Sequence, residues 1–370
     1  MQIEALTKND LKLINELSSR NYTSLSLSSN SSEEERHQFK NIKEKLKKIA
    51  NYFSDKYKLY GPFQTNVSPE ANPMSRGNTL NYVWSTFFKG TKNKQYSAQI
   101  SFVIDKQVSC LNIGFYFGSA SAHSLHIKER DELESTLNRL GTLLSDAIKN
   151  NPSIKTRYND LFDLGFSAYI NGENTLPDLW IDKINYDPKN SNITIKVFPN
   201  ESGYIELLTL DFYVSQVIFL MTAIESTKSN QKTVPPLTSE QWAKRAERKA
   251  KIGSDGELFV WKKECEKLRK NGSKKEAKHV ALESIHYGYD ILSYDNNENE
   301  IYIEVKTTTR QKKDPKSKQF FLSSNEYNTY LTNKSKYKLY RVYEIENEPH
   351  FEELNLENVN KQADGYIIEY

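Results

Sequence analysis

The sequence predicts a mixed α/β (α+β) protein with two domains. The chain has 370 residues, which is more than one hydrophobic core usually serves. A polar stretch with paired prolines, "STKSNQKTVPPLTSEQ", divides it near residue 235. Helical periodicity and short strand-like runs occur on both sides of this stretch. We therefore expect one domain over 1–230, a linker over 231–245 and a second domain over 246–370.

The first domain is expected to contain both helices and strands. Its N-terminus reads as an amphipathic helix, and a longer helix follows a Ser-rich loop at 24–36, with Ile42, Leu46, Ile49 and Phe53 on one face. A further helix is expected over 128–150 and an apolar one over 214–228. Strand-like runs are expected at 95–104, 110–118, 191–199 and 204–212.

The second domain has the expected order α-(α)-β-β-β-α-β. A helix is expected from about Ser254 to Lys270, followed by a short basic helix at 273–284. Strands are expected at "GYDILSYD", "IYIEVKTTT" and "KQFFLS", then a helix at "SSNEYNTYLTN" and a last strand at "KYKLYRVYEI".

Composition excludes several classes of protein. No apolar run approaches 18 residues, and the N-terminus has no apolar signal core, so we expect no membrane contact. Two distant cysteines, Cys110 and Cys265, fit a reducing compartment and exclude a zinc knuckle or a disulfide framework. We expect a cytoplasmic protein. The net charge is only +3, but residues 243–279 are rich in Lys and Arg. This stretch is either a solvated helix face or a phosphate-binding surface.

Charged side chains in the predicted strand 301–309 raise the question of a site. Because strand side chains alternate between faces, Glu304 and Lys306 project together, opposite Ile303 and Val305. A turn at "DNNEN" joins this strand to the one that contains Asp290. An even register places Asp290 beside Glu304 and Lys306, whereas an odd register separates them. The sequence leaves the register open.

Two adjacent carboxylates repel each other unless a cation lies between them, and such hard oxygen ligands suit Mg²⁺. A nearby lysine could then orient or deprotonate a water, as in metal-assisted phosphodiester hydrolysis. The alternative is an exposed salt bridge of little energetic value. Glu257 is a third acid, either part of a capping box in "SDGE" or facing the sheet. Glu326 in "SSNE" is expected to cap a helix, whose N-terminus could bring Ser324 or Asn325 to a phosphate.

The element order, together with Asp290, Glu304-Val305-Lys306 and Glu257, resembles the PD-(D/E)XK nuclease superfamily. Tyr289 stands where that family's name has proline. More narrowly, "IGSDGELFVWKKECEKL", "GYDILSYD", "YIEVKTT" and "FFLSSNEY" look like the C-terminal domain of the NO VEIN type. The resemblance implies metal-dependent DNA cleavage. Asp290, Glu304 and the Val305 carbonyl would bind Mg²⁺, for which Mn²⁺ could substitute, Lys306 would activate water, and Glu257 would complete the network.

In the first domain, "SRGNTLNYVWSTFFKG" (75–90) resembles the N-terminal domains of McrB-like restriction proteins. That resemblance implies binding of DNA, with methylated sites among the candidates. Arg76 could contact guanine or phosphate, and Asn78 could read adenine. Tyr82 and Trp84 could stack on an extruded base. The alternative is that these aromatic residues belong to the core.

Together these features predict a Mg²⁺-dependent, type II-like restriction endodeoxyribonuclease acting on double-stranded DNA. The resemblance implies a homodimer with C2 symmetry and a cognate DNA methyltransferase as further partners. The competing hypothesis is a DNA-binding or assembly subunit of a defence system, with a nuclease fold that is inactive or dependent on a partner.

Overall fold

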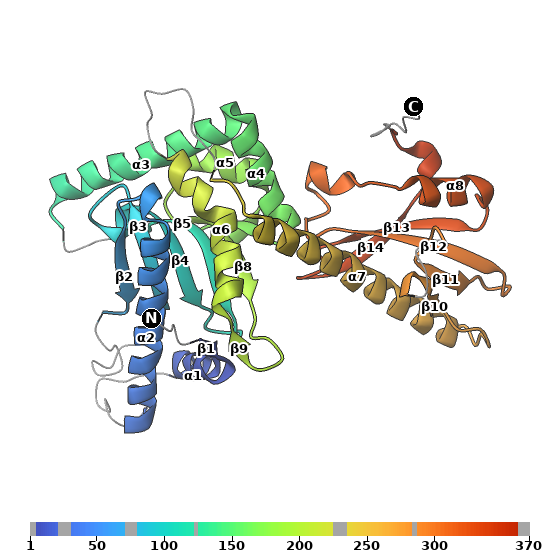
Figure 1. Ribbon diagram of the computed structural model, residues 1–370, viewed down its shortest axis with the longest axis horizontal. Coiled ribbons are helices and arrows are strands. Elements are labelled where there is room, and N and C mark those ends of the chain that lie inside the picture. The colour runs from blue at the N-terminus through green and yellow to red at the C-terminus, as the bar shows by residue number, and fades with distance from the viewer. Residues whose placement is uncertain are drawn as a thin grey trace. The chain divides into compact units, whose positions relative to one another are not determined.

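The computed structural model describes residues 5–20, 31–70, 80–121, 125–224, 235–282 and 287–361. The chain divides into two compact units, Met1–Lys244 (unit 1) and Arg245–Tyr370 (unit 2), both visible in Figure 1. Both contain helices and a sheet, so the predicted mixed α+β class is confirmed. No helix in the described ranges is long and apolar enough to cross a membrane.

Unit 1 is organised around a seven-stranded antiparallel sheet. Its strands, in spatial order, are β2 (Gln64–Ser68), β3 (Val83–Lys89), β4 (Ala98–Ile104), β5 (Leu111–Phe117), β8 (Ser191–Val197), β6 (Ser167–Ile170) and β7 (Glu173–Thr175). Phe87, Ile100, Phe115 and Ile193 oppose one another in register and are fully buried. One face of this sheet therefore forms the core of the unit.

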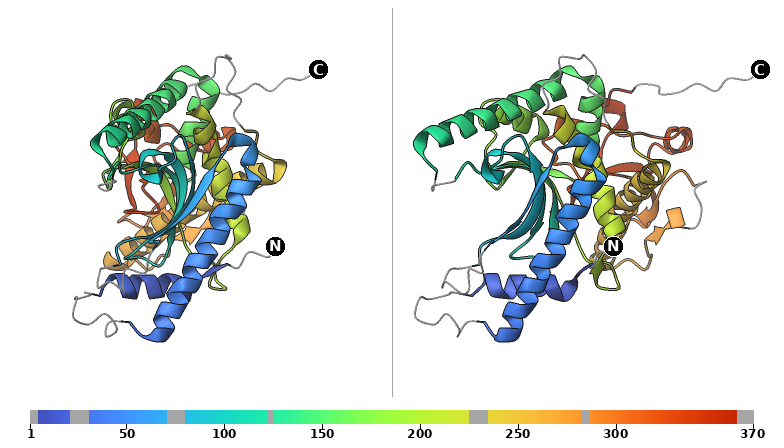
Figure 2. Two further views of the ribbon diagram at one scale, coloured as in Figure 1. Left: turned by 90° about the vertical axis from the view of Figure 1, so that its left-hand side faces the viewer. Right: turned by 60° about the vertical axis from the view of Figure 1, so that its left-hand side comes forward.

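Among its described residues, unit 1 also has six helices that lie wholly within it and a small two-stranded sheet of β1 (Leu6–Thr7) and β9 (Tyr204–Ile205). The helices are α1 (Lys8–Ser18), α2 (Glu33–Lys56), α3 (Ile127–Asn150), α4 (Pro152–Asp163), α5 (Pro177–Ile184) and α6 (Leu207–Ala223). Figure 2 shows α2 extending along the sheet, where it packs on β2 and β3. The predicted apolar face of α2 is confirmed, since Ile42, Leu46, Ile49 and Phe53 are buried.

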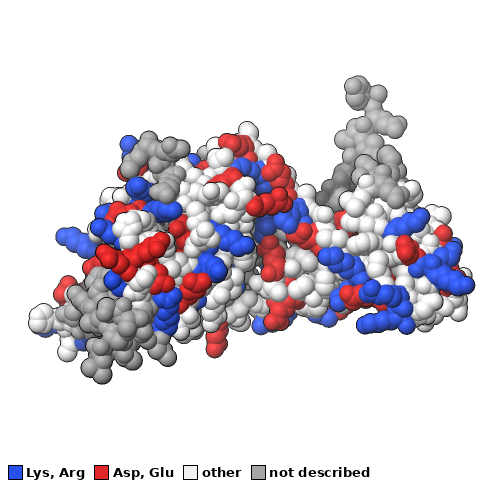
Figure 3. Space-filling view, turned by 90° about the horizontal axis from the view of Figure 1, so that it is seen from below, with Lys and Arg blue, Asp and Glu red and all other residues white. Residues whose placement is uncertain are grey.

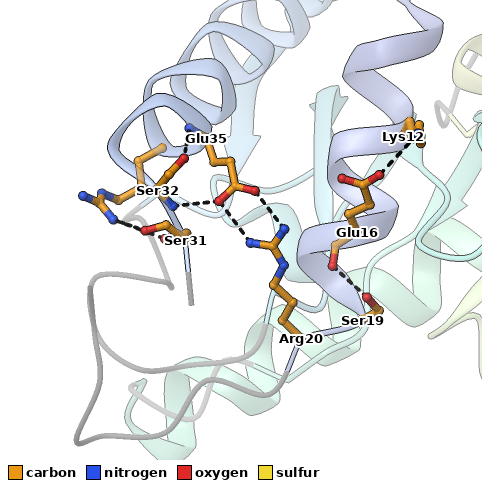
Figure 4. Close-up of polar contacts among 8 residues, drawn as sticks. Lys12, Glu16, Ser19, Arg20, Ser31, Ser32 and Glu35 are labelled. Atoms are coloured by element: carbon orange, nitrogen blue, oxygen red, sulfur yellow. Dashed lines mark hydrogen bonds and ion pairs between the residues drawn. The ribbon is translucent and has the colours of Figure 1, made fainter. Parts of the chain in front are cut away.

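An ion pair joins the end of α1 to the start of α2 (Figure 4). Both terminal nitrogens of the Arg20 guanidinium donate to the Glu35 carboxylate, at 3.0 and 2.8 Å. Glu35 also accepts a hydrogen bond from the Ser32 backbone, in a capping box at the N-terminus of α2. The hydrogen bonds from Arg20 hold the pKa of Glu35 at about 2, below its usual value. One carboxylate thus both caps α2 and fixes the end of α1.

The predicted strand at 204–212 is wrong beyond its first residues. Only Tyr204–Ile205 form a strand, and α6 begins at Leu207. This helix is apolar on nearly all sides and is mostly buried. A short apolar run has no periodicity that separates a buried strand from a buried helix, which explains the error.

Unit 2 contains a five-stranded sheet in the order β10-β11-β12-β13-β14. The strands are β10 (Lys278–His279), β11 (Ile291–Tyr294), β12 (Glu300–Thr307), β13 (Tyr337–Tyr343) and β14 (His350–Leu354). Only the β12–β13 pair is parallel. The helix α7 (Ser239–Lys270) packs on the face with Ile291, Ile303 and Val305, whereas α8 (Ser324–Thr332) lies on the opposite face with Tyr302 and Tyr337.

Three expectations for this unit are corrected. The helix begins at Ser239, not near Ser254, and therefore occupies 239–245 of the expected linker. In place of a helix at 273–284 the described residues form β10 and a short 3-10 helix, η4 (Val280–Leu282). Residues 319–323 are not a strand and follow a second 3-10 helix, η5 (Pro315–Lys318). The described elements α7-β10-β11-β12-α8-β13 have the order α-β-β-β-α-β, but this agrees with the expected order only because β10 replaces the predicted helix at 273–284 and no strand forms at 318–323.

Candidate active site

The register between β11 and β12 is the even one. Ile291 pairs with Ile303 and Leu292 with Tyr302, so one further step places Asp290 opposite Glu304. Directly opposed residues project from the same face of a sheet. Asp290, Glu304 and Lys306 therefore share the face that α8 covers, as the even register requires.

The backbone before β11 fixes the position of Asp290. Gly288 has a φ of +71°, and a Cβ atom there would lie 2.2 Å from the Thr329 hydroxyl of α8. Only glycine allows both this conformation and this close approach. Asp290 then donates its N–H to the Ile303 carbonyl at 2.9 Å, and its Oδ2 accepts from the Val305 N–H at 2.8 Å. The carboxylate is thus held against β12.

Lys306 lies between two carboxylates. Its Nζ is 2.7 Å from Glu304 Oε1 and 2.8 Å from Glu326 Oε2. Glu304 is 2% exposed, and the Lys306 side chain is 18% exposed. This buried three-residue arrangement differs from the exposed salt bridge that was the alternative interpretation of the strand.

Burial and crowding make the negative charge of this site unfavourable. Burial raises the pKa of Asp290, and the charge of Glu257 raises it further. Burial also raises the pKa of Glu304, with a second contribution from Asp290. Burial lowers the pKa of Lys306, but Glu304 and Glu326 outweigh that effect and the net change is upward. The site therefore holds carboxylates that a cation would stabilise.

Glu257 is near this site but is engaged elsewhere. Its Oε2 lies 2.8 Å from His279 Nε2, on β10. The capping-box interpretation of "SDGE" is wrong, because Ser254 and Glu257 lie inside α7. The glycine of that sequence has another role, since a Cβ atom on Gly256 would lie 1.9 Å from Thr307 Oγ1. This close contact between α7 and β12 sets the depth at which Glu257 approaches the sheet.

The oxygen donors of this site are of the kind that Mg²⁺ accepts. Among the described residues, no three or more His, Cys, Asp and Glu side chains form a group that could hold a metal ion. Mg²⁺ typically uses only one or two carboxylates and keeps several waters or substrate oxygens. Asp290 and Glu304 offer two buried carboxylates with raised pKa values, and the carbonyl of Val305 is the third expected ligand.

Three residues beside the site make contacts that the sequence did not reveal. Glu326 accepts from the Ser323 N–H, as the predicted cap requires, but it also contacts Lys306. His279 contacts Glu257. Arg341 pairs in register with Lys306, is 4% exposed and donates to the Ser317 carbonyl at 2.7 and 2.9 Å. The repeat of Ser-x-x-Glu was a signal for the cap only, and no local pattern indicates the other contacts.

The basic stretch 243–279 does not form a single helix face. Exposed Lys262, Lys263 and Lys270 lie on α7, whereas Lys274 and Lys275 follow the end of the helix. Figure 3 shows Lys and Arg gathered over unit 2 on the side that it displays. The positive charge is therefore distributed over a helix and the loop after it. Ser324 and Asn325 are exposed at the start of α8.

Two of the four candidate DNA-binding residues of unit 1 are described. Arg76 and Asn78 lie outside the described residues. Tyr82 is 65% exposed, so it is not a core residue, and Lys106 lies 6.0 Å from its ring centroid. Trp84 is half-buried on β3, with the Lys94 ammonium 5.4 Å from its ring centroid. Both rings thus have a lysine over one side.

The fold and these contacts define unit 2 as an α/β domain with a buried acidic and lysine-containing site on one sheet face. Residues 256–354, which include this site, match the family described as protein NO VEIN, C-terminal. No curated protein and no solved structure matches the chain.

Proposed function

We propose that the chain is a Mg²⁺-dependent restriction-type endodeoxyribonuclease whose chemistry occurs on the sheet of unit 2. The observation that carries this proposal is the shared face of Asp290, Glu304 and Lys306, given by the register of β11 and β12. The order α7-β10-β11-β12-α8-β13 and the match of 256–354 to the NO VEIN C-terminal family support it. Unit 1 would recognise the DNA site, and the active form would be a homodimer that cuts both strands.

Each residue of the site has a distinct part in this reaction. Asp290, Glu304 and the Val305 carbonyl would hold Mg²⁺, which when bound supplies positive charge for the scissile phosphate. Lys306 would position the attacking water and stabilise the negative charge that develops on the phosphate. Glu257, paired with His279, would maintain the negative field around Asp290.

Plasmid cleavage tests this proposal. Purified protein is incubated with Mg²⁺ and plasmids of different methylation states, alongside Lys306→Ala and Glu304→Ala. We expect both variants to cleave at least about 10²-fold more slowly, as for loss of a group that acts in the transition state. Lys338→Ala is the matched control, because Lys338 lies on the neighbouring strand and pairs with Glu353. Cleavage that is unaffected by either site substitution would contradict the assignment.

The alternative function is a DNA-binding or assembly subunit with an inactive or partner-dependent nuclease fold. It draws on the engagement of Glu257 by His279. Tight binding of plasmid without cleavage under any metal would favour it.

A further inference from the structure

Two carboxylates from different elements hold the ammonium group of Lys306. Glu304 is two positions before it on β12, and Glu326 is at the third position of α8. The Nζ–Oε distances are 2.7 and 2.8 Å. An ammonium group has three donors, so these two contacts fix its direction and leave one donor for a substrate or a water.

A single oxygen of Glu326 has two hydrogen-bond partners. Oε2 accepts from Lys306 Nζ at 2.8 Å and from the Ser323 backbone N–H at 2.9 Å. Ser323 Oγ in turn accepts from the Glu326 N–H at 3.2 Å, which completes the capping box of α8. The cap therefore fixes the rotamer of Glu326, and Glu326 transmits that position to Lys306.

The two carboxylates differ in what a bound cation would do to them. Under the proposed function, Glu304 is a ligand for Mg²⁺, and a divalent cation there competes with Lys306 for the same carboxylate and repels its positive charge. Glu326 is not in the proposed ligand set and stays bound to its cap. On the basis of the proposed function, we infer that Glu326 is a positioning residue that retains Lys306 in the site when Glu304 binds metal.

A cycle of variants tests this inference without metal or DNA. The protected ammonium resonance of Lys306 is observed in ¹H–¹⁵N spectra and assigned by its loss in Lys306→Arg. We expect it to persist in Glu304→Gln and in Glu326→Gln, each of which leaves one charged partner, and to disappear in the double variant. The inference would be overturned if the Lys306 resonance is lost in the single variant Glu304→Gln. It would also be overturned if the resonance persists in the double variant.

Addition of Mg²⁺ gives a second comparison. In the wild type the resonance is expected to persist, because Glu326 still holds the lysine. In Glu326→Gln it is expected to disappear once Mg²⁺ is present. A resonance that Mg²⁺ removes from the wild type and the variant alike would contradict a retaining role for Glu326.

The capping role of Glu326 can be separated from its contact with Lys306. Glutamine also serves at the third position of a capping box, so Glu326→Gln keeps the cap and removes the charge. Ser323→Ala weakens the cap and leaves the charge, and we expect it to lower the melting temperature by about 2–8 °C while the Lys306 resonance remains. Loss of the resonance in Ser323→Ala would show that the charged Glu326 carboxylate does not by itself hold Lys306, and would contradict the inference.

Cleavage kinetics connect the inference to the reaction. We expect Glu326→Gln to lower kcat by about 10²-fold, as for a misplaced reacting group, with KM for plasmid within about twofold. Equal kcat for the wild type and Glu326→Gln would overturn the positioning role. If the wild type cleaves no DNA, the proposed nuclease function fails, and the resonance cycle still decides whether Glu326 retains Lys306.

Discussion

At the scale of single residues, the site of unit 2 combines four carboxylates with few cations. Glu257, Asp290 and Glu326 all influence the titration of their neighbours, and Glu304 is almost fully buried. Lys306 is the only cation that touches two of these acids within the described contacts. Such crowding costs stability in the absence of a further cation, which is a feature of many functional sites. Replacement of one of these acids should therefore change the free energy of unfolding measurably.

Asp290→Asn should stabilise the metal-free protein at high pH. The pKa of Asp290 is raised in the folded state, so the stability it contributes is complete below the unfolded pKa and is lost as the pH rises through the folded pKa. Asparagine can still accept the hydrogen bond from Val305. We expect the free energy of unfolding of Asp290→Asn to exceed that of the wild type by about 1 kcal/mol or more at pH 8 and to differ little at pH 4. Urea unfolding in EDTA measures it.

With excess Mg²⁺, the wild type should become more stable than Asp290→Asn at pH 8, because the ion binds and stabilises the wild type and not the variant. Asp295→Asn is a comparison of opposite sign, because hydrogen bonds from Asn299 lower the pKa of Asp295, so that its replacement should lower the stability at pH 8. If metal-free Asp290→Asn is less stable than the metal-free wild type at pH 8, the buried Asp290 carboxylate does not destabilise the fold.

At the scale of elements, close contact between α7 and β12 places the helix over the sheet. The Cβ position of Gly256 is 1.9 Å from Thr307 Oγ1, whereas nothing lies within 4 Å of the corresponding position at Gly253, one turn earlier. The two glycines thus form a matched pair on one helix. Only Gly256 is required by the packing.

Gly256→Ala should destabilise unit 2, while Gly253→Ala should not. A methyl group at 256 must displace Thr307, at a cost of about 1–3 kcal/mol. The same change at 253 meets no atom and should stabilise by about 0.5–1 kcal/mol through helix propensity. Urea unfolding of both variants measures the difference, and equal effects would contradict the packing role of Gly256.

Prediction at the element scale succeeded where amphipathic periodicity was long. The helix α2 was predicted with its buried face, and β4, β5, β11 and β12 were placed close to their observed ranges. It failed for 273–284, where a basic sequence suggested a helix and β10 instead pairs with β11. It also failed for the start of α7, because a charged, exposed helix segment has no apolar pattern to mark it. Tertiary pairing overrides weak local preference in such segments.

At the scale of the whole molecule, the candidate catalytic residues and the candidate DNA-binding residues lie in different units. Unit 2 contains the candidate site, whereas unit 1 has a large sheet with the partly exposed Trp84 on β3 and the exposed Tyr82 directly before that strand. Lys106 and Lys94 lie over these two rings. Aromatic rings accompanied by positive charge are typical of surfaces that stack on bases and attract phosphates.

Replacement of Tyr82 and Trp84 by alanine in the full chain should weaken DNA binding and leave Mg²⁺-dependent stabilisation unchanged. Each base–aromatic stack contributes about 1–3 kcal/mol, so the double variant should bind at least about tenfold more weakly. Tyr204→Ala is the control, because Tyr204 is also an exposed tyrosine of unit 1. Fluorescence anisotropy measures the affinity. Equal loss in the control would exclude a specific role for the two residues.

The sequence by itself determined the class of fold and the common face of Glu304 and Lys306, because alternation along one strand is a local property. Only the tertiary structure decided the register that adds Asp290, the contact of Glu257 with His279 and the second partner of Lys306. These contacts join residues 14 to 22 positions apart through strand pairing and helix packing. No local pattern specifies them, since strand register and helix packing are set by the burial of apolar faces in the folded chain.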